Sequence, residues 1–137
     1  MQLAYTILYV SDVPKTLAHY EAAFGCTQRF LHESSLYGEL ETGETVLGFA
    51  AHQMAEANHV AMRVSDPKDV TGPVNITFTT DDVDTAYKHA LGNGATPAMP
   101  PVTKPWGQVS SYVRDINGHL IEIATPLLKR HGATEGN

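Results

Sequence analysis

Glu122, in the last apolar stretch of the chain, has the surroundings of a reactive or ligand-binding carboxylate. The sequence LIEIA places it between two pairs of apolar residues. Apolar neighbours withdraw a carboxylate from water and raise its pKa, so we expect Glu122 to serve as a base or as an anchor for a cationic ligand. The alternative is a carboxylate satisfied within the protein, with Asn75 as its hydrogen-bond partner.

An indole and an imidazole are further candidates for ligand contact. Trp106 lies between Pro105 and Gly107, where a restricted backbone can present its ring to a planar ligand. The alternative is that its ring seals a sheet edge. His52 follows the apolar run LGFAA and shares the alternation of Gly48, which would bring it to the rim of a cavity.

Other reactive residue types have structural interpretations. His19 and His89 hold matching positions on two predicted helices, and we expect both on the helix surface. Arg114 precedes a predicted turn, where a salt bridge that steadies the turn is favoured over contact with a ligand anion. Cys26 is the only cysteine, so it forms no internal disulfide, and we expect it to pack rather than react.

The composition fits one globular domain of 137 residues, with 42% hydrophobic and 18% charged residues. The formal net charge of −6, without a Lys/Arg cluster, argues against a nucleic-acid partner. Apolar runs of a few residues fall far below the roughly 20 needed to cross a bilayer, and no basic segment precedes the first apolar stretch. We therefore expect a cytoplasmic protein without a membrane partner.

The elements that must position these side chains occur twice, 70 residues apart. Residues 5–25 align with residues 75–95, which places Asp12 over Asp82. Each copy begins with β-branched and aromatic residues typical of a strand. An aspartate that can cap a helix, apolar residues at helical spacing and a glycine-rich end follow in both copies. Each copy therefore predicts a strand followed by a helix.

Strand-rich sequence follows both predicted helices. The first copy contains two strands around the turn at Thr42 and Gly43, and the second contains two strands around Asn117 and Gly118. Asn-Gly favours a type I′ hairpin, in which both central residues have positive φ. One hairpin is therefore predicted at the end of each copy.

A further strand is predicted before each hairpin, near 27–32 and near 96–102, and prolines restrict the second to a sheet edge or an irregular segment. The predicted fold class is α+β, with two βαβββ modules in a single domain that covers 1–137. Its parts are module one at about 3–52, a connector over 53–73, module two at about 74–126 and a polar tail over 127–137.

The order of these features resembles the vicinal oxygen chelate superfamily of glyoxalases, bleomycin-resistance proteins and extradiol dioxygenases, over residues 4–126. The features that carry the resemblance are VSDV at a helix start, FG or NGA at a helix end, and DINGHLIEI in the last hairpin. The stretch PPVTKPWGQVSSYVRDINGHLIEI is especially similar to the second module of small bacterial glyoxalase-like proteins. The resemblance implies curved sheets that form a half-barrel around a pocket, often in a homodimer whose two chains complete the sites.

Metal-dependent members of that superfamily hold a divalent ion with side chains from the first and last strands of each module. By resemblance, these places correspond to Tyr5, Gly48, Asn75 and Glu122. Only Glu122 has the expected ligand chemistry, and a dedicated site needs several carboxylate or imidazole donors. We therefore expect no metal and no other cofactor.

Strand alternation predicts the lining of the pocket, because side chains two residues apart share a face. From those four positions, the concave side also includes Ile7, Tyr9, Ala50, His52, Thr77, Thr79, Leu120 and Ala124. Such a mixture of aromatic, aliphatic and a few polar groups fits a small-molecule site. The predicted ligand-binding residues are Tyr5, Tyr9, His52, Asn75, Trp106 and Glu122.

Three functions are compatible with these observations. The first is a metal-free binding protein that sequesters a small, partly aromatic or cationic compound. The second is a metal-dependent lyase, isomerase or dioxygenase with Glu122 as a metal ligand. The third is metal-free catalysis with Glu122 or His52 as the base. The ligand census disfavours the second function.

Overall fold

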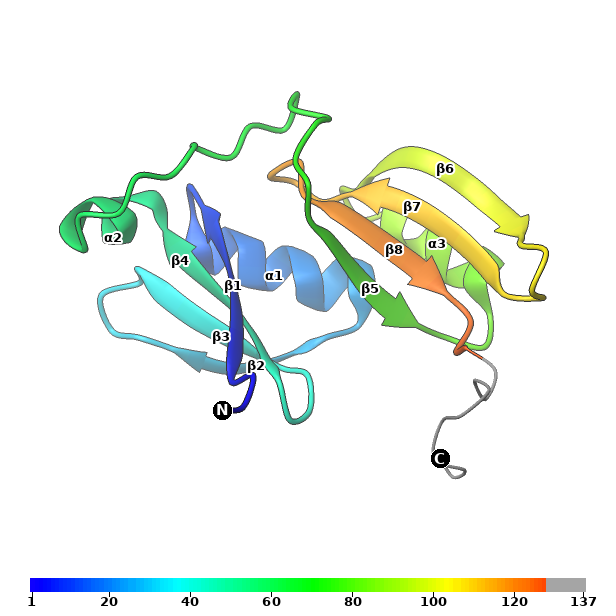
Figure 1. Ribbon diagram of the computed structural model, residues 1–137, viewed down its shortest axis with the longest axis horizontal. Coiled ribbons are helices and arrows are strands. Elements are labelled where there is room, and N and C mark those ends of the chain that lie inside the picture. The colour runs from blue at the N-terminus through cyan, green and yellow to red at the C-terminus, as the bar shows by residue number, and fades with distance from the viewer. Residues whose placement is uncertain (128–137) are drawn as a thin grey trace.

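The computed structural model of the protein describes residues 1–127 (Figure 1). The first half contains β1 (Tyr5–Val10), α1 (Val13–Phe24), β2 (Thr27–Leu31), β3 (Tyr37–Glu41), β4 (Val46–Ala51) and the short helix α2 (His52–Ala57). The second half contains β5 (Asn75–Thr79), α3 (Val83–Leu91), β6 (Thr96–Thr103), β7 (Val109–Arg114) and β8 (Leu120–Ala124). The predicted polar tail lies outside the described residues, apart from its first position.

The two halves have the same topology, which confirms the predicted α+β fold of two βαβββ modules. Sheet one has the strand order β1-β4-β3-β2, and sheet two has the order β5-β8-β7-β6. The first strand of each module runs parallel to its last strand, a pairing that needs a crossover such as the helix between them. Tyr5 pairs with Val46, and Asn75 pairs with Leu120.

Both long helices begin at the predicted aspartates. Asp12 Oδ1 accepts a hydrogen bond from the backbone N–H of Lys15 at 3.0 Å, and Asp82 Oδ1 accepts one from Thr85 at 3.1 Å. Each carboxylate satisfies an amide that has no partner within the helix. Gly25 ends α1 with a φ of 68°, a left-handed conformation in which glycine avoids a steric cost.

The hairpin at Asn117 and Gly118 is confirmed, but its predicted turn type is wrong. Gly118 has a φ of 92°, whereas Asn117 is not among the residues with positive φ. The Gly118 N–H donates to the Asp115 carbonyl at 3.0 Å, and the Asp115 N–H donates to the His119 carbonyl at 3.0 Å. The loop therefore has three residues, with glycine alone in the left-handed position. Asn117 is held instead by its side chain, which donates to Thr16 Oγ1 at 3.0 Å.

The two additional strands, β2 and β6, are confirmed, and both lie at sheet edges. The register of β6 against β7 shifts twice, between Pro97 and Met99 and between Met99 and Val102, as expected for a strand that contains prolines. The segment after β4 differs from the prediction. Strand alternation does not continue to His52, because this residue begins α2.

The two modules share one hydrophobic core, to which both helices and both sheets contribute. Phe24 at the end of α1 stacks on Phe78 of β5, with ring centroids 5.5 Å apart. Two histidines connect the helices in a nearly symmetrical way. His19 on α1 donates to the Asn93 carbonyl after α3, and His89 on α3 donates to the Ala22 carbonyl on α1, at 3.1 and 2.7 Å.

The expectation that His19 lies on the helix surface is wrong, since its side chain is only 7% exposed. His19 lies on the face of α1 that packs against module two. This face is covered only when the two modules pack together. Burial lowers the pKa of His19, although Asp115 and the bond to Asn93 oppose this effect. The ring is therefore a neutral part of the module interface.

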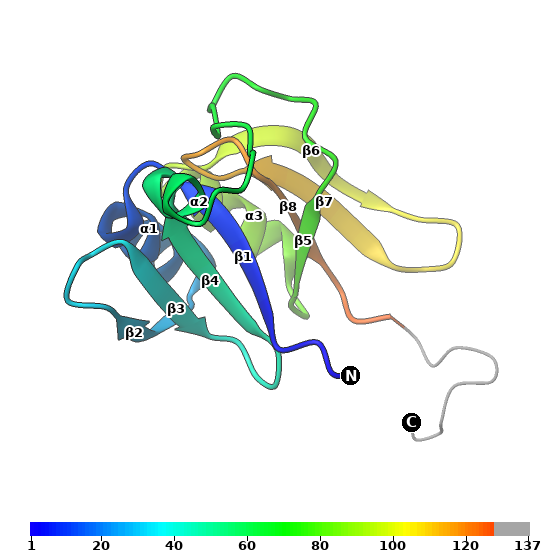
Figure 2. The same cartoon turned by 60° about the vertical axis from the view of Figure 1, so that its left-hand side comes forward.

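Each sheet has one face covered by its helix and one open face. Figures 1 and 2 show α1 behind sheet one and α3 behind sheet two. Residues that pair directly across neighbouring strands share a face. The open face of sheet one carries Tyr5, Ile7, Tyr9, Phe30, Tyr37, Glu39 and Gly48, and that of sheet two carries Asn75, Thr77, Tyr112, Leu120 and Glu122. Within residues 1–127, no helix is long and apolar enough to span a membrane.

Candidate functional site

Glu122 lies at the centre of a polar cluster on the open face of sheet two. Its Oε1 accepts hydrogen bonds from Asn75 Nδ2 at 3.2 Å and from Thr77 Oγ1 at 2.9 Å. Its Oε2 accepts one from Ser110 Oγ at 2.5 Å. Tyr112 pairs directly with Glu122 across β7 and β8, and its hydroxyl also helps to lower the pKa of the Glu122 carboxyl. All these partners are neutral groups.

The expectation of a raised pKa for Glu122 is wrong. Burial raises the pKa of this carboxyl, but hydrogen bonds from Ser110, Thr77, Asn75 and Tyr112 outweigh burial and lower the pKa below its usual value. Each donor favours the ionised form, because a carboxylate is a better acceptor than a carboxylic acid. Glu122 is therefore a stable anion at neutral pH and a poor general base.

The open face of sheet one carries a carboxylate that sequence analysis did not select. Tyr37 Oη donates to Glu39 Oε2 at 2.7 Å. Arg29 Nε lies 3.8 Å from Glu39 Oε1, and the Glu39 side chain is only 15% exposed. Tyr37 lies over Gly48, where an added Cβ would stand 2.9 Å from the tyrosine hydroxyl. The alternation of Tyr37 and Glu39 along one strand was the sequence signal for this pair.

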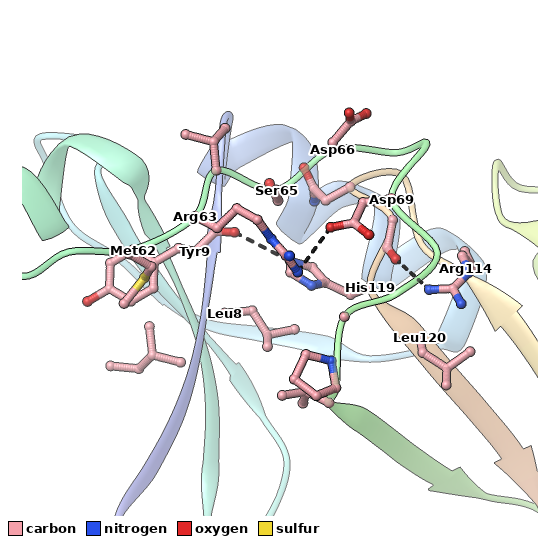
Figure 3. A pocket seen from close by; sticks show the side chains of 17 residues that line it. Leu8, Tyr9, Met62, Arg63, Ser65, Asp66, Asp69, Arg114, His119 and Leu120 are labelled. Carbon is pink, nitrogen blue, oxygen red and sulfur yellow. Dashed lines mark hydrogen bonds and ion pairs between the residues drawn. The ribbon is translucent and has the colours of Figure 1, made fainter.

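A pocket of about 350 Å³ lies between β1, the β7–β8 turn and the connector (Figure 3). This volume is at the lower end of the range for small-molecule sites, roughly 300–1,000 Å³. Most of its walls are apolar, and they include Leu8, Met62 and Leu120. Glu122 does not line the pocket, but Leu120 lies two residues before it on the same face of β8. The pocket therefore adjoins the polar cluster.

The connector forms one wall of this pocket and is attached at several points. An added Cβ on Gly118 would lie only 2.3 Å from the Asp66 carbonyl oxygen, so the connector packs directly on the hairpin turn. Arg114 donates to the carbonyls of Gly118 at 3.0 Å and Val70 at 3.2 Å. Arg114 thus steadies the turn, as favoured from the sequence, although it does so through backbone carbonyls rather than a salt bridge.

Internal pairing satisfies much of the polar chemistry around the pocket. Arg63 and Asp69 of the connector form a salt bridge of 3.0 Å. His119 Nε2 donates to the Tyr9 carbonyl at 3.4 Å. The pocket is therefore suited to the apolar part of a ligand more than to a charged group.

Of the six predicted ligand-binding residues, the structure joins Asn75 and Glu122 directly. Tyr9 lines the pocket and is half-buried. Tyr5 lies on the open face of β1 and is 58% exposed. Ligand contact by these residues stays a prediction.

The other two predicted residues lie apart from this cluster. His52 does not itself line the pocket but bonds to Ser65, which does: its Nε2 accepts from the Ser65 N–H at 3.2 Å and lies 3.0 Å from Ser65 Oγ, which attaches α2 to the connector. Trp106 lies in the β6–β7 loop, is 59% exposed, and donates to Gln108 Oε1 at 3.0 Å. Its ring is available for contact but lines no part of the pocket described above.

The residues at the four metal-ligand positions do not fit a divalent ion. Gly48 offers no side chain and is covered by Tyr37. Asn75 uses its amide nitrogen on Glu122. Among residues 1–127, no group of three or more His, Cys, Asp or Glu side chains could hold a metal ion. Glu122 alone provides too few donors to replace the hydration shell of such an ion.

The single thiol is not set up as a nucleophile. Burial, together with the nearby charge of Glu21, raises the pKa of Cys26 to about 11. Its thiol is therefore protonated at neutral pH, whereas nucleophilic cysteines require a thiolate.

Comparison with known proteins places this geometry in a family. The model of the Glyoxalase/Bleomycin resistance protein/Dioxygenase superfamily matches residues 2–123. The chain belongs to this superfamily. The resemblance predicted from the repeat and the hairpin motifs is thereby confirmed. No curated protein matches the chain closely enough to count as a relative.

Several solved structures superpose on most of the chain. A glyoxalase-related enzyme from Fulvimarina pelagi is 23% identical, covers 92% of this chain and 88% of its own, and has a TM-score of 0.78. A superfamily enzyme from Burkholderia phytofirmans PsJN is 23% identical over 93% of this chain and 100% of its own, with a TM-score of 0.77. TioX from Micromonospora sp. ML1 is 20% identical, covers 93% of this chain and 100% of its own, and has a TM-score of 0.68. At these identities, the similarity establishes the fold.

Proposed function

We propose that this superfamily member is a metal-free binding protein that sequesters a small organic cation with an apolar or aromatic body. The observation that carries the proposal is the ionised Glu122 carboxylate, which is surrounded by neutral donors on an open sheet face. Neutral donors orient a carboxylate and favour its charge but do not neutralise it. A cationic ligand would supply the missing counter-charge.

The adjoining pocket supports the apolar part of this proposal. Leu120 belongs to the pocket wall, and Glu122 follows it on the same face of β8. Side chains two residues apart on a strand lie about 7 Å from each other. A ligand of moderate size can therefore place an apolar body in the pocket and a cationic group at Glu122.

The lowered pKa of Glu122 also separates this function from the catalytic alternatives. A general base acts best when its pKa lies near the working pH, and the hydrogen bonds to Glu122 move its pKa in the opposite direction. A metal-dependent lyase, isomerase or dioxygenase would need donors that the residues at positions 5, 48 and 75 do not provide. Sequestration is thus the function that the site supports best.

We further propose that the protein is a homodimer. Both open faces carry exposed aromatic or aliphatic side chains: Tyr5 and Ile7 on sheet one, and Val102, which pairs with Ser110, on sheet two. A second copy that covers the open faces would enclose the ligand between a sheet of each chain. Enclosure strengthens the attraction between Glu122 and a cation, because the local dielectric constant falls.

The test is a fluorescence titration with acriflavine, a planar aromatic cation, and compares two variants of equal charge change. Glu122→Gln should weaken binding by about tenfold or more, the order expected for loss of a partly screened ion pair. Glu44→Gln, which changes an exposed carboxylate in the β3–β4 turn, should leave the affinity unchanged. Equal affinities for all three proteins would reject Glu122 as the anchor.

Metal content provides a second test. The purified protein should contain no stoichiometric metal, and nickel, zinc, manganese and iron should not raise its melting temperature. A tightly bound ion lost in Glu122→Gln would reject the metal-free proposal in favour of the metal-dependent alternative.

A further inference from the structure

The open face of sheet one combines a poorly neutralised carboxylate with exposed aromatic rings. Glu39 is 15% exposed, and its only cationic neighbour among the described residues is Arg29, at 3.8 Å. The Arg29 side chain is itself 46% exposed, so its charge is well hydrated and screened. The hydrogen bond from Tyr37 satisfies one carboxylate oxygen without supplying charge.

Two exposed aromatic rings lie on the same face of the sheet as this carboxylate. Phe30 pairs directly with Glu39 across β2 and β3, and it is 45% exposed. Tyr5 on β1 is 58% exposed. Tyr5 also lies near enough to Tyr37 to contribute to the electrostatic environment of its hydroxyl. Large exposed rings beside a partly buried carboxylate are unusual for a surface that remains in water.

The position of Tyr37 depends on a glycine in the neighbouring strand. A Cβ at Gly48 would stand 2.9 Å from the Tyr37 hydroxyl oxygen and 3.3 Å from the ring carbon that bears it. The missing side chain therefore leaves room for the tyrosine hydroxyl, which donates to Glu39. Gly48 and Tyr37 together hold the carboxylate in place beside Phe30.

We propose that this face of sheet one is a second binding subsite, which takes an alkyl- or aryl-ammonium group with Glu39 as its counter-ion and Phe30 and Tyr5 as its walls. The subsite rests on the proposed function and extends it, because the ligand class then has a cationic group recognised by aromatic faces as well as by a carboxylate. Ammonium groups without N–H donors are bound in this way through cation–π attraction. Arg29 occupies the carboxylate only partially and is displaced when the ligand binds.

The experiment is an NMR titration of the full chain with phenyltrimethylammonium, whose charge is permanent. N,N-dimethylaniline, a neutral molecule of similar shape, serves as the ligand control. The amide signals of β3, from Tyr37 to Glu41, should shift with the cation and not with the neutral analogue. Equal shifts with both compounds would overturn the proposal, since they would report apolar contact alone.

Two variants of one ion pair give opposite predictions. Glu39→Gln should weaken the cation's binding at β3 by about tenfold. Arg29→Gln removes the competing cation and should strengthen binding of phenyltrimethylammonium at β3 by about threefold. This change of about threefold lies within the range of interaction energies measured for exposed ion pairs. Because Arg29 is largely exposed, this variant retains the fold even if Glu39→Gln does not. Weaker binding in Arg29→Gln would overturn the proposal.

Glu122→Gln distinguishes this inference from the proposed function. If the β3 shifts persist in Glu122→Gln and disappear in Glu39→Gln, the second subsite is supported. In a different outcome, the cation changes the NMR signals of residues around Glu122 alone, with binding abolished by Glu122→Gln and not by Glu39→Gln. That result rejects the second subsite, while the proposed function stands. If neither substitution alters cation binding, both carboxylate assignments are rejected.

Discussion

At the scale of single residues, the neighbours of a carboxylate determine its role more than its burial does. The apolar residues around Glu122 in the sequence suggested a raised pKa, and the structure shows the reverse because Ser110, Thr77 and Asn75 all donate to it. These donors come from two other strands, so no local sequence pattern identifies them. The favoured expectation of a raised pKa therefore failed, while the bond to Asn75, given from the sequence only as the alternative, is present.

Replacement of Ser110 by alanine tests the cause of this low pKa. Ser110→Ala removes the 2.5 Å bond to Oε2, so the pKa of Glu122 should rise toward its usual value. An NMR titration of the side-chain carboxyl carbon measures the change. In the wild type, the lowered pKa stabilises the folded state above about pH 4.5, the unperturbed value, and this stabilisation is lost as pH falls through the folded-state pKa. Ser110→Ala should lose less stability over that acidic range, and an unchanged titration would contradict the assignment.

The buried imidazole of His19 predicts a different pH dependence. Its folded-state pKa is lowered, chiefly by burial, so the unfolded chain binds a proton more readily. The associated stability is present above the usual histidine pKa of 6.5 and is lost as pH falls below it. Urea denaturation at about pH 7.5 and about pH 5.5 should show weaker folding at the lower pH. His19→Gln should reduce that difference; an equal pH dependence in the variant would exclude His19 as the source.

At the scale of elements, local chemistry predicted the repeat well and the contacts between modules poorly. The strands, the two aspartate caps and both hairpins follow from propensity and capping, which act within a few residues. The start of α2 at His52 and the burial of His19 depend on partners far along the chain, namely Ser65 and Asn93. The turn at Asn117 was also misjudged for this reason, because a distant helix holds its side chain.

The contact between the connector and the last hairpin can be measured with two glycines. Gly118 and Gly107 have almost equal φ values, 92° and 91°, but only Gly118 has neighbours within 4 Å of an added Cβ. Gly107→Ala should cost about 1–2 kcal/mol for the left-handed conformation. Gly118→Ala should cost more, since the Asp66 carbonyl must also move. Urea denaturation compares the two variants, and equal losses would show that connector packing adds no stability.

At the scale of the whole molecule, the modules share one hydrophobic core and leave two open sheet faces. The shared core and the paired histidines join the helical sides of both sheets. The open faces are then free to meet a second copy, as the proposed homodimer requires. Analytical ultracentrifugation should give twice the monomer mass of 14.9 kDa. A monomer at all concentrations would reject the dimer.

Mixed dimers test whether each ligand is enclosed by two chains. If sheet one of one copy faces sheet two of the other, a mixed dimer of Glu39→Gln and Glu122→Gln chains contains one intact site and one site that lacks both carboxylates. Mixing the two variants by refolding should therefore restore high-affinity binding at up to half of the sites in each mixed dimer. No restoration in dimers shown to be mixed would place both carboxylates of a site in one chain.

The ring of Tyr37 over Gly48 also constrains the evolutionary routes open to this chain. A histidine or glutamate introduced at position 48, as a step toward chelation, would place its Cβ 2.9 Å from the tyrosine hydroxyl. The tyrosine side chain must shift to admit that Cβ, and the shift disturbs the hydrogen bond that orients Glu39. A first substitution toward a metal site therefore weakens the existing arrangement before a new site exists.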